Sequence, residues 1–131
     1  MRPGPTTISL TVPASPSSIA IVRTVAATVA GRLDVPYDTV DDLRIAVAEA
    51  CNRILTSAPH AAELRLEVEW DEASLVATVS TAVSPGDDRA PAHATAWEWR
   101  IIEGLTDHAS EAITDGRLAI ELRIGIGSRV V

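Results

Sequence analysis

The sequence predicts an α+β sandwich, in which helices cover one face of a mixed or antiparallel sheet. Apolar residues follow helical spacing in residues 16–33 and 38–55, and they alternate with polar residues in the segments that flank these stretches. The expected order of elements is strand, helix, helix, strand, strand, loop, helix, strand, strand. Helices and strands that are partly segregated along a chain are typical of α+β folds. At 131 residues, we expect one domain spanning residues 1–131.

The first elements are a strand and two helices. Residues 6–12 alternate apolar and polar side chains, which predicts a strand with one buried face. Ser15 is expected to be the N-cap of the first helix, with Pro16 at the first helical position. Asp38 and Asp41 are expected to form a capping box at the start of the second helix.

The second half of the chain reads as two hairpins joined by a loop and a helix. Residues 63–70 show the clearest alternation in the sequence, and residues 75–83 return as a second strand. Residues 84–93 are rich in Pro, Gly and Asp and predict a loop. A helix is expected over residues 95–109. The final hairpin is expected over residues 111–126, around an Asp-Gly turn.

The charge of the chain restricts its partners. Eighteen acidic residues oppose 11 basic ones, all of them Arg, which gives a net charge of −7. Such a surface repels phosphate backbones, so we expect no direct binding to nucleic acid. The same surface is suited to a basic protein partner.

Membrane, disulfide and metal chemistry have little support in the sequence. No apolar run approaches the length that crosses a bilayer, and residues 1–9 contain no apolar signal core, so a cytoplasmic protein is expected. The single cysteine, Cys51, excludes an internal disulfide and is expected to be a buried thiol. His60, His93 and His108 have no metal-ligand spacing, and no metal site is expected.

The second helix carries the candidate chemical groups. Glu49 could be a general base, or it could be a charge at the helix boundary paired with Arg53 at i+4. Asn52 has an amide oxygen that can ligate Mg²⁺. Arg53 cannot ligate a metal because guanidinium has no acceptor, but it could bind phosphate directly.

The tryptophans carry most of the aromatic mass, because the chain has no Phe. Trp70 ends the alternating strand and is expected in the core. Trp97 and Trp99 lie two residues apart on an expected helix, so they diverge by about 160° around it. One of the two should therefore be buried and the other more exposed, and the exposed one is a candidate for an interface.

The order of elements and the stretch RIAVAEACNRIL resemble the RsbW-type anti-sigma factors, which are serine kinases of the GHKL (histidine-kinase-like ATPase) superfamily. In that family an Arg-bearing helix leads, through a short Asp/Pro connection, to a helix of the form AV-x-EA-x-x-N. Residues 21–50 match this arrangement without a gap, and the resemblance is specific over residues 18–55. It implies a GHKL sandwich, with a mixed sheet and helices on one face.

The resemblance also implies a degenerate ATP site. Glu49 falls on the family's catalytic glutamate, whereas Arg53 replaces the magnesium asparagine and Asn52 lies one position too early. Ala82 and Val83 lie about where the family has the acid and first glycine of its adenine-binding D-x-G-x-G motif. The glycine-rich lid should fall within APAHATAWEWR, which contains no glycine. Glu49 is therefore expected to be vestigial and paired with Arg53, and ATP and Mg²⁺ are not required.

The implied function is that of an anti-sigma factor. It would keep an alternative, sigma-F-like factor from RNA polymerase and would release it by partner switching with a STAS-domain anti-anti-sigma factor. Family members generally act as dimers, and their first-helix arginine, here Arg23, lies on the partner-binding surface. Two alternatives stay open: an active ATP-dependent serine kinase that uses Glu49 to phosphorylate the antagonist, and a regulatory module of another partner-switching pathway.

Overall fold

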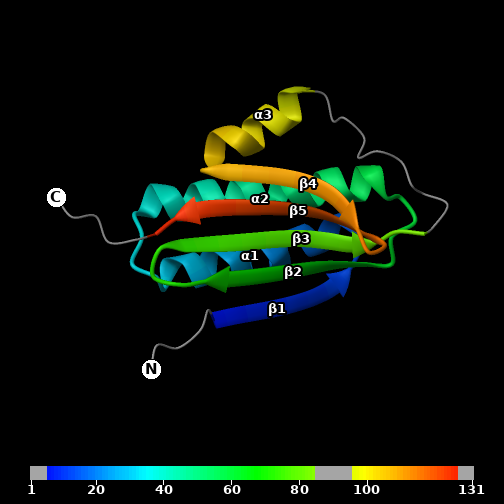
Figure 1. Ribbon diagram of the computed structural model, residues 1–131. Helices are drawn as coiled ribbons and strands as arrows, with labels where there is room; N and C mark the ends of the chain where they lie inside the picture. Colours follow the sequence, from blue (N-terminus) through cyan, green and yellow to red (C-terminus); the bar gives the residue numbers. More distant parts are fainter. Residues whose placement is uncertain (1–5, 85–95, 127–131) are drawn as a thin grey trace.

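The computed structural model describes residues 6–84 and 96–126, and it has the expected order of strands and helices (Figure 1). The elements are β1 (Thr6–Pro13), a 3-10 turn (Pro16–Ser18), α1 (Ile19–Gly31), α2 (Tyr37–Ser57), β2 (Glu63–Trp70), β3 (Ser74–Ala82), α3 (Ala96–Leu105), β4 (His108–Thr114) and β5 (Arg117–Gly125). This arrangement confirms the α+β fold.

The described strands form one sheet in the order β1-β2-β3-β5-β4, and every neighbouring pair is antiparallel. Helices α1 and α2 lie side by side against one face of the sheet, and α3 lies beside β4 (Figure 1). Because α2 contacts both β3 and β5, it is the central helix of the second layer. The expected sandwich, with helices on one face, is confirmed, but the described sheet is antiparallel and not the mixed sheet that the resemblance implies.

The core lies between α2 and the sheet. Leu43, Val47, Ala50 and Ile54 recur at helical spacing on α2, and all four are fully buried. The sheet contributes the buried side chains Leu64, Leu66, Val68, Leu75, Ala77, Val79, Leu118, Ile120, Leu122 and Ile124. Each large side chain of this kind stabilises the fold by roughly 1.5–3 kcal/mol relative to an exposed one. The position of α2 on the sheet is therefore strongly determined.

Both expected helix starts differ from the structure. Ser15 is the N-cap of the 3-10 turn that begins at Pro16, its side chain accepts no capping bond, and α1 itself begins only at Ile19. The capping box is also wrong, because Pro36 is the N-cap of α2 and its carbonyl accepts the first backbone bonds of the helix. Asp38 thus lies inside the first turn, and Asp41 instead accepts hydrogen bonds from Arg44.

The third helix and the strand after it are also shifted from their expected bounds. Helix α3 ends at Leu105, and β4 begins at His108. Asp107 causes this change because its backbone N–H donates to the Arg123 carbonyl and its carboxylate accepts from the Gly125 N–H. These bonds bring the chain into the sheet earlier than helical periodicity suggested. The Asp-Gly turn is confirmed by the positive φ angles of both its residues.

Cys51 is fully buried on α2, as expected. Desolvation by burial raises the pKa of its thiol from 9.0 to about 12. The thiol therefore stays protonated at neutral pH, and it is a poor nucleophile. Within the described part of the chain, no helix is long and apolar enough to span a membrane.

The Cys51 thiol should resist iodoacetamide at pH 8 in the folded protein and react readily in denaturant. Because the pKa of the folded state is the higher one, the unfolded chain loses the thiol proton first as pH rises. The free energy of unfolding should therefore fall between about pH 9 and 12 relative to that of Cys51→Ala. Rapid labelling of the native thiol, or identical pH profiles for the two proteins, would contradict this account.

Candidate functional site

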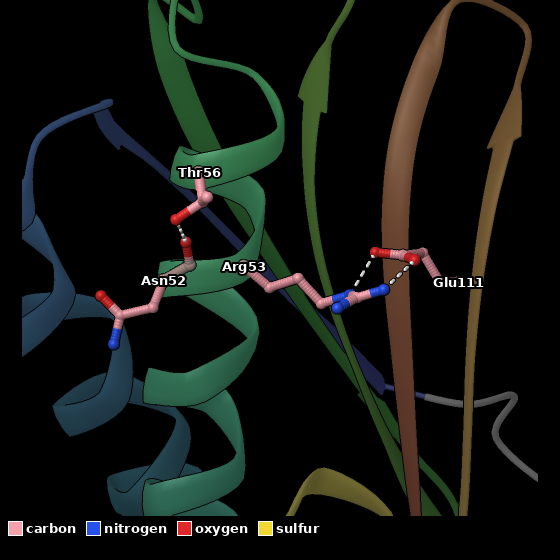
Figure 2. Close-up of polar contacts among 4 residues, drawn as sticks. All are labelled: Asn52, Arg53, Thr56 and Glu111. Carbon is pink, nitrogen blue, oxygen red and sulfur yellow. Dashed lines mark hydrogen bonds and ion pairs between the residues drawn. The ribbon is translucent and has the colours of Figure 1, made fainter. Parts of the chain in front are cut away.

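The candidate site lies at the C-terminal part of α2, where Arg53 faces the sheet (Figure 2). Arg53 continues the buried stripe of Ala46 and Ala50, and only 7% of its surface is exposed. A charge in this position is costly unless it is paired and hydrogen-bonded. The partner is on β4, since the Glu111 carboxylate accepts bonds from Arg53 Nε at 2.7 Å and from Nη2 at 2.8 Å.

The sheet positions Glu111 for this contact. On β4 the exposed residues Ser110 and Ala112 flank it, so its side chain points to the face covered by helices. Glu111 is also opposite the fully buried Ile120 of β5. The Glu111 side chain is only 8% exposed and that of Arg53 only 6%. The result is a bidentate ion pair inside the protein, of the kind that combines strength with fixed geometry.

A third element contacts the same guanidinium. The Cζ atom of Arg53 lies 5.2 Å from the centroid of the Trp99 ring on α3. A cation at this distance over an indole contributes about 0.5–2 kcal/mol, with the higher value where water is excluded. Trp99 is half-buried against the core, whereas Trp97 is 70% exposed. The expected difference between the two tryptophans is therefore present, although Trp99 is half-buried and not fully buried. Trp70, which was expected in the core, is half-buried at its margin.

The expected ion pair between Glu49 and Arg53 is wrong. Glu49 is half-buried one turn before Arg53, and it forms no ion pair within the described residues. The i+4 rule applies to two side chains that share a solvated helix face. Arg53 instead reaches away from its own helix, because Glu111 accepts two bonds from the Nε–Nη2 edge of its guanidinium in the interior.

Asn52 does not join this group. Its side chain is exposed and points to the opposite side of α2 from Arg53 (Figure 2). The Asn52 backbone carbonyl accepts a hydrogen bond from Thr56 Oγ1 at 2.9 Å. An amide in this orientation could not share a ligand with the guanidinium of Arg53. No contact joins Arg23, half-buried on α1, to Arg53, Glu111 or Trp99 in the described residues.

The end of β3 contributes no carboxylate. Ala82 is the exposed last residue of the strand, and the backbone N–H of Val83 donates to the Gly116 carbonyl at 2.8 Å. The buried hydroxyl of Thr81 is committed to the Glu63 carbonyl at 2.7 Å. Residues 85–95, which contain the rest of the expected adenine motif and most of the lid, lie outside the described residues.

Glu111 is the functional residue that sequence reasoning missed. The alternation of inward Ala109, Glu111 and Ile113 would have placed an acid on the buried face and predicted a buried Arg partner. The sequence does not reveal this pattern readily, because the helix expected over residues 95–109 places the start of the strand at Glu111 itself. Among the described residues, no group of three or more His, Cys, Asp or Glu could hold a metal ion.

Comparisons with known proteins agree with the fold. The family described as "Histidine kinase-like ATPase domain" matches residues 12–124. "Anti-sigma-F factor RsbW" of Mycobacterium tuberculosis is 33% identical over 110 residues, which cover 84% of this chain and 63% of that protein. "Serine-protein kinase RsbW" of Halalkalibacterium halodurans is 43% identical over 54 residues, which cover 41% of this chain and 33% of that protein. The chain thus spans less than two thirds of the length of either relative.

A solved structure leads to the same fold. The crystal structure of the RsbU and RsbW domains of a Mycobacterium tuberculosis protein superposes with a TM-score of 0.71. The match covers 96% of this chain and 34% of that chain, at 14% sequence identity. At this identity the likeness concerns the fold.

Glu111→Gln should lower the free energy of unfolding by about 3–5 kcal/mol, because it leaves the Arg53 charge buried without a carboxylate. Asp41→Asn is the matched control, since it breaks an ion pair with Arg44 on the same helix whose side chains are 40% and 41% exposed. That loss should stay below about 1 kcal/mol. Urea unfolding measures both, and equal losses would contradict the buried role of Glu111.

Proposed function

Because the chain belongs to the Histidine kinase-like ATPase domain family, we propose that it is an anti-sigma factor which sequesters an alternative, sigma-F-like factor from RNA polymerase. The resemblance inferred from the sequence is confirmed by this membership and by the relatives named RsbW. The match to a protein named anti-sigma-F factor extends over 84% of this chain, which supports a binding function for the same fold.

The buried ion pair of Arg53 is the observation that carries the proposal. In the resembling family this position holds the asparagine that binds magnesium, and here it holds a permanent cation bonded to Glu111. A guanidinium offers no lone pair to a metal, and it repels one. Magnesium-dependent phosphoryl transfer needs that metal to neutralise the charge on the phosphates. We infer a degenerate nucleotide site, a vestigial Glu49 and a function that requires no cofactor.

An active serine kinase is the second candidate. It is favoured by the half-buried Glu49 on α2 and by relatives that are named serine-protein kinases. Such an enzyme would transfer phosphate from ATP to its antagonist, and Glu49→Ala would abolish the transfer. The cation at position 53 and the absence of a carboxylate at Ala82 and Val83 favour the binding function over this one.

The partners follow from the surface and from the resemblance. A net charge of −7 suits a sigma factor, since sigma factors expose basic surfaces to DNA. Release would come from a STAS-domain anti-anti-sigma factor that competes for the same surface, and the anti-sigma factor would act as a homodimer in the cytoplasm. Arg23 on α1 is the proposed partner-binding residue.

Isothermal titration of the nucleotide-free protein against the candidate sigma factor tests the proposal. Sub-micromolar binding is expected without ATP, because the fold is held together by its own side chains. The same titration with Mg-ATP should give the same affinity. No binding in either condition would contradict the anti-sigma function, and phosphate transfer to the antagonist would support the kinase instead.

Arg23→Glu should weaken sigma binding by about 2 kcal/mol or more, because it places a negative charge on the proposed contact surface. Arg32→Glu is the matched control, since Arg32 is an exposed residue at the other end of the same helix. Both variants should melt close to the wild-type temperature. Equal affinities for the two variants would remove Arg23 from the interface.

A further inference from the structure

Three elements that are distant in the sequence meet at one guanidinium. Arg53 belongs to α2, its carboxylate partner Glu111 belongs to β4, and the ring beneath its Cζ atom belongs to Trp99 of α3. The two bonds to Glu111, at 2.7 and 2.8 Å, fix the plane of the guanidinium as well as its position. A ring that lies over a fixed cation is itself restricted in position.

Helix α3 has few other anchors. It spans Ala96–Leu105, which is too short to be stable as an isolated helix. Ile102 is its one fully buried described side chain, while Trp99 and Leu105 are half-buried against the core. Ile102 and Leu105 both lie in the C-terminal half of the helix, where they anchor its end next to β4. The contact of Trp99 with Arg53 anchors the N-terminal half.

We propose that Arg53, with Glu111 and Trp99, is a latch that holds α3 on the fold without any bound ligand. Arg53 is the positioning residue, because it acts on α3 through the Trp99 ring. Glu111 neutralises the guanidinium, so no anionic ligand is needed to stabilise it. With Trp99 fixed inward, Trp97 must point outward, about 160° away around the helix, and it is 70% exposed.

Holding α3 in place is a different effect from raising the free energy of unfolding of the whole protein. Replacing a buried ion pair by apolar residues of similar volume is often neutral or stabilising, because both desolvation penalties disappear. Such a replacement removes the flat, fixed cation on which an indole can stack. Stability and the attachment of α3 should therefore respond differently to the same double substitution, and this difference separates a latch from a structural pair.

Hydrogen exchange of the backbone amides of α3 tests the latch. In Arg53→Met/Glu111→Leu these amides should exchange at least tenfold faster than in the wild type. Amides of β2 and β3 should be unchanged, and the melting temperature should be preserved. Asp41→Asn, which breaks an exposed pair on α2, should exchange like the wild type. Unchanged protection of α3 in the double variant would overturn the proposal, since Ile102 and Leu105 would then anchor the helix without the cation.

Trp99→Leu provides an independent arm, because it leaves both buried charges paired and removes only the ring. It should produce the same faster exchange in α3, and unchanged exchange would overturn the proposal even if the double variant failed to fold. Trp99→Phe keeps a weaker aromatic face and should recover part of the protection. Phe is also closer to Trp in volume than Leu is, so the double variant, which keeps the Trp99 ring and removes only the cation, separates the cation-π contact from the volume of the side chain.

This inference rests on the proposed function and extends it. An anti-sigma factor with this latch would have α3 in place before any nucleotide binds. In the wild type, Mg-ATP should therefore leave the exchange of α3 unchanged. Slower exchange on adding Mg-ATP would overturn the proposal. The measurement contains no sigma factor, so its failure is distinguishable from a failure of the titration that tests the proposed function.

Discussion

The ion pair between Arg53 and Glu111 is the interaction on which the arrangement of α2, β4 and α3 depends. An arginine on the buried stripe of α2 has no stable environment unless a carboxylate meets it inside the protein. Glu111 can meet it because the strand alternation turns this residue toward the helices. The pair thereby joins the central helix to an edge strand, and the Trp99 ring adds α3 to the same point. Apolar packing determines how the helices lie on the sheet, and this ion pair determines how α2 contacts β4 and α3.

The same pair determines what chemistry the site can support. In the resembling family this position carries a metal ligand, whereas here it carries a cation whose Nε and Nη2 atoms both donate to one carboxylate. Opening the pair to admit a metal and phosphates would leave a charge buried without its partner, a change that costs several kcal/mol. Magnesium-dependent phosphoryl transfer by a base such as Glu49 needs that metal. The ion pair therefore supports the proposed binding function over the proposed kinase activity.

Much of the fold could be predicted because each element carries its own period. The alternation in residues 63–70 and the helical stripe of α2 are local patterns, and both appear in the structure. The errors have two causes. Asp107 bonds to β5 and begins β4 early, and this distant contact has no signature in the segment that it changes. At the start of α2 the signal is local, since the Pro36 carbonyl accepts the first backbone bonds of the helix, but the sequence pattern predicts a capping box two residues later.

Only one of the two residues of the ion pair could be predicted from local patterns in the sequence. Arg53 stands out as a cation on an apolar helix, but the i+4 rule for helix side chains predicts Glu49 as its partner. The true partner is 58 residues away, and only the register of β4 reveals it. A buried charge predicts that a partner exists, and it predicts the partner's chemistry. The tertiary structure is needed to say which residue it is.

The most direct test of the central claim is equilibrium binding of Mg-ATP to the purified chain, by isothermal titration with and without EDTA. If Arg53 and Glu111 have replaced the metal site, any heat at millimolar ATP should be the same whether or not Mg²⁺ is present. Micromolar binding that requires Mg²⁺ and disappears in Glu49→Ala would contradict the account. It would show that the ion pair opens to admit a nucleotide after all.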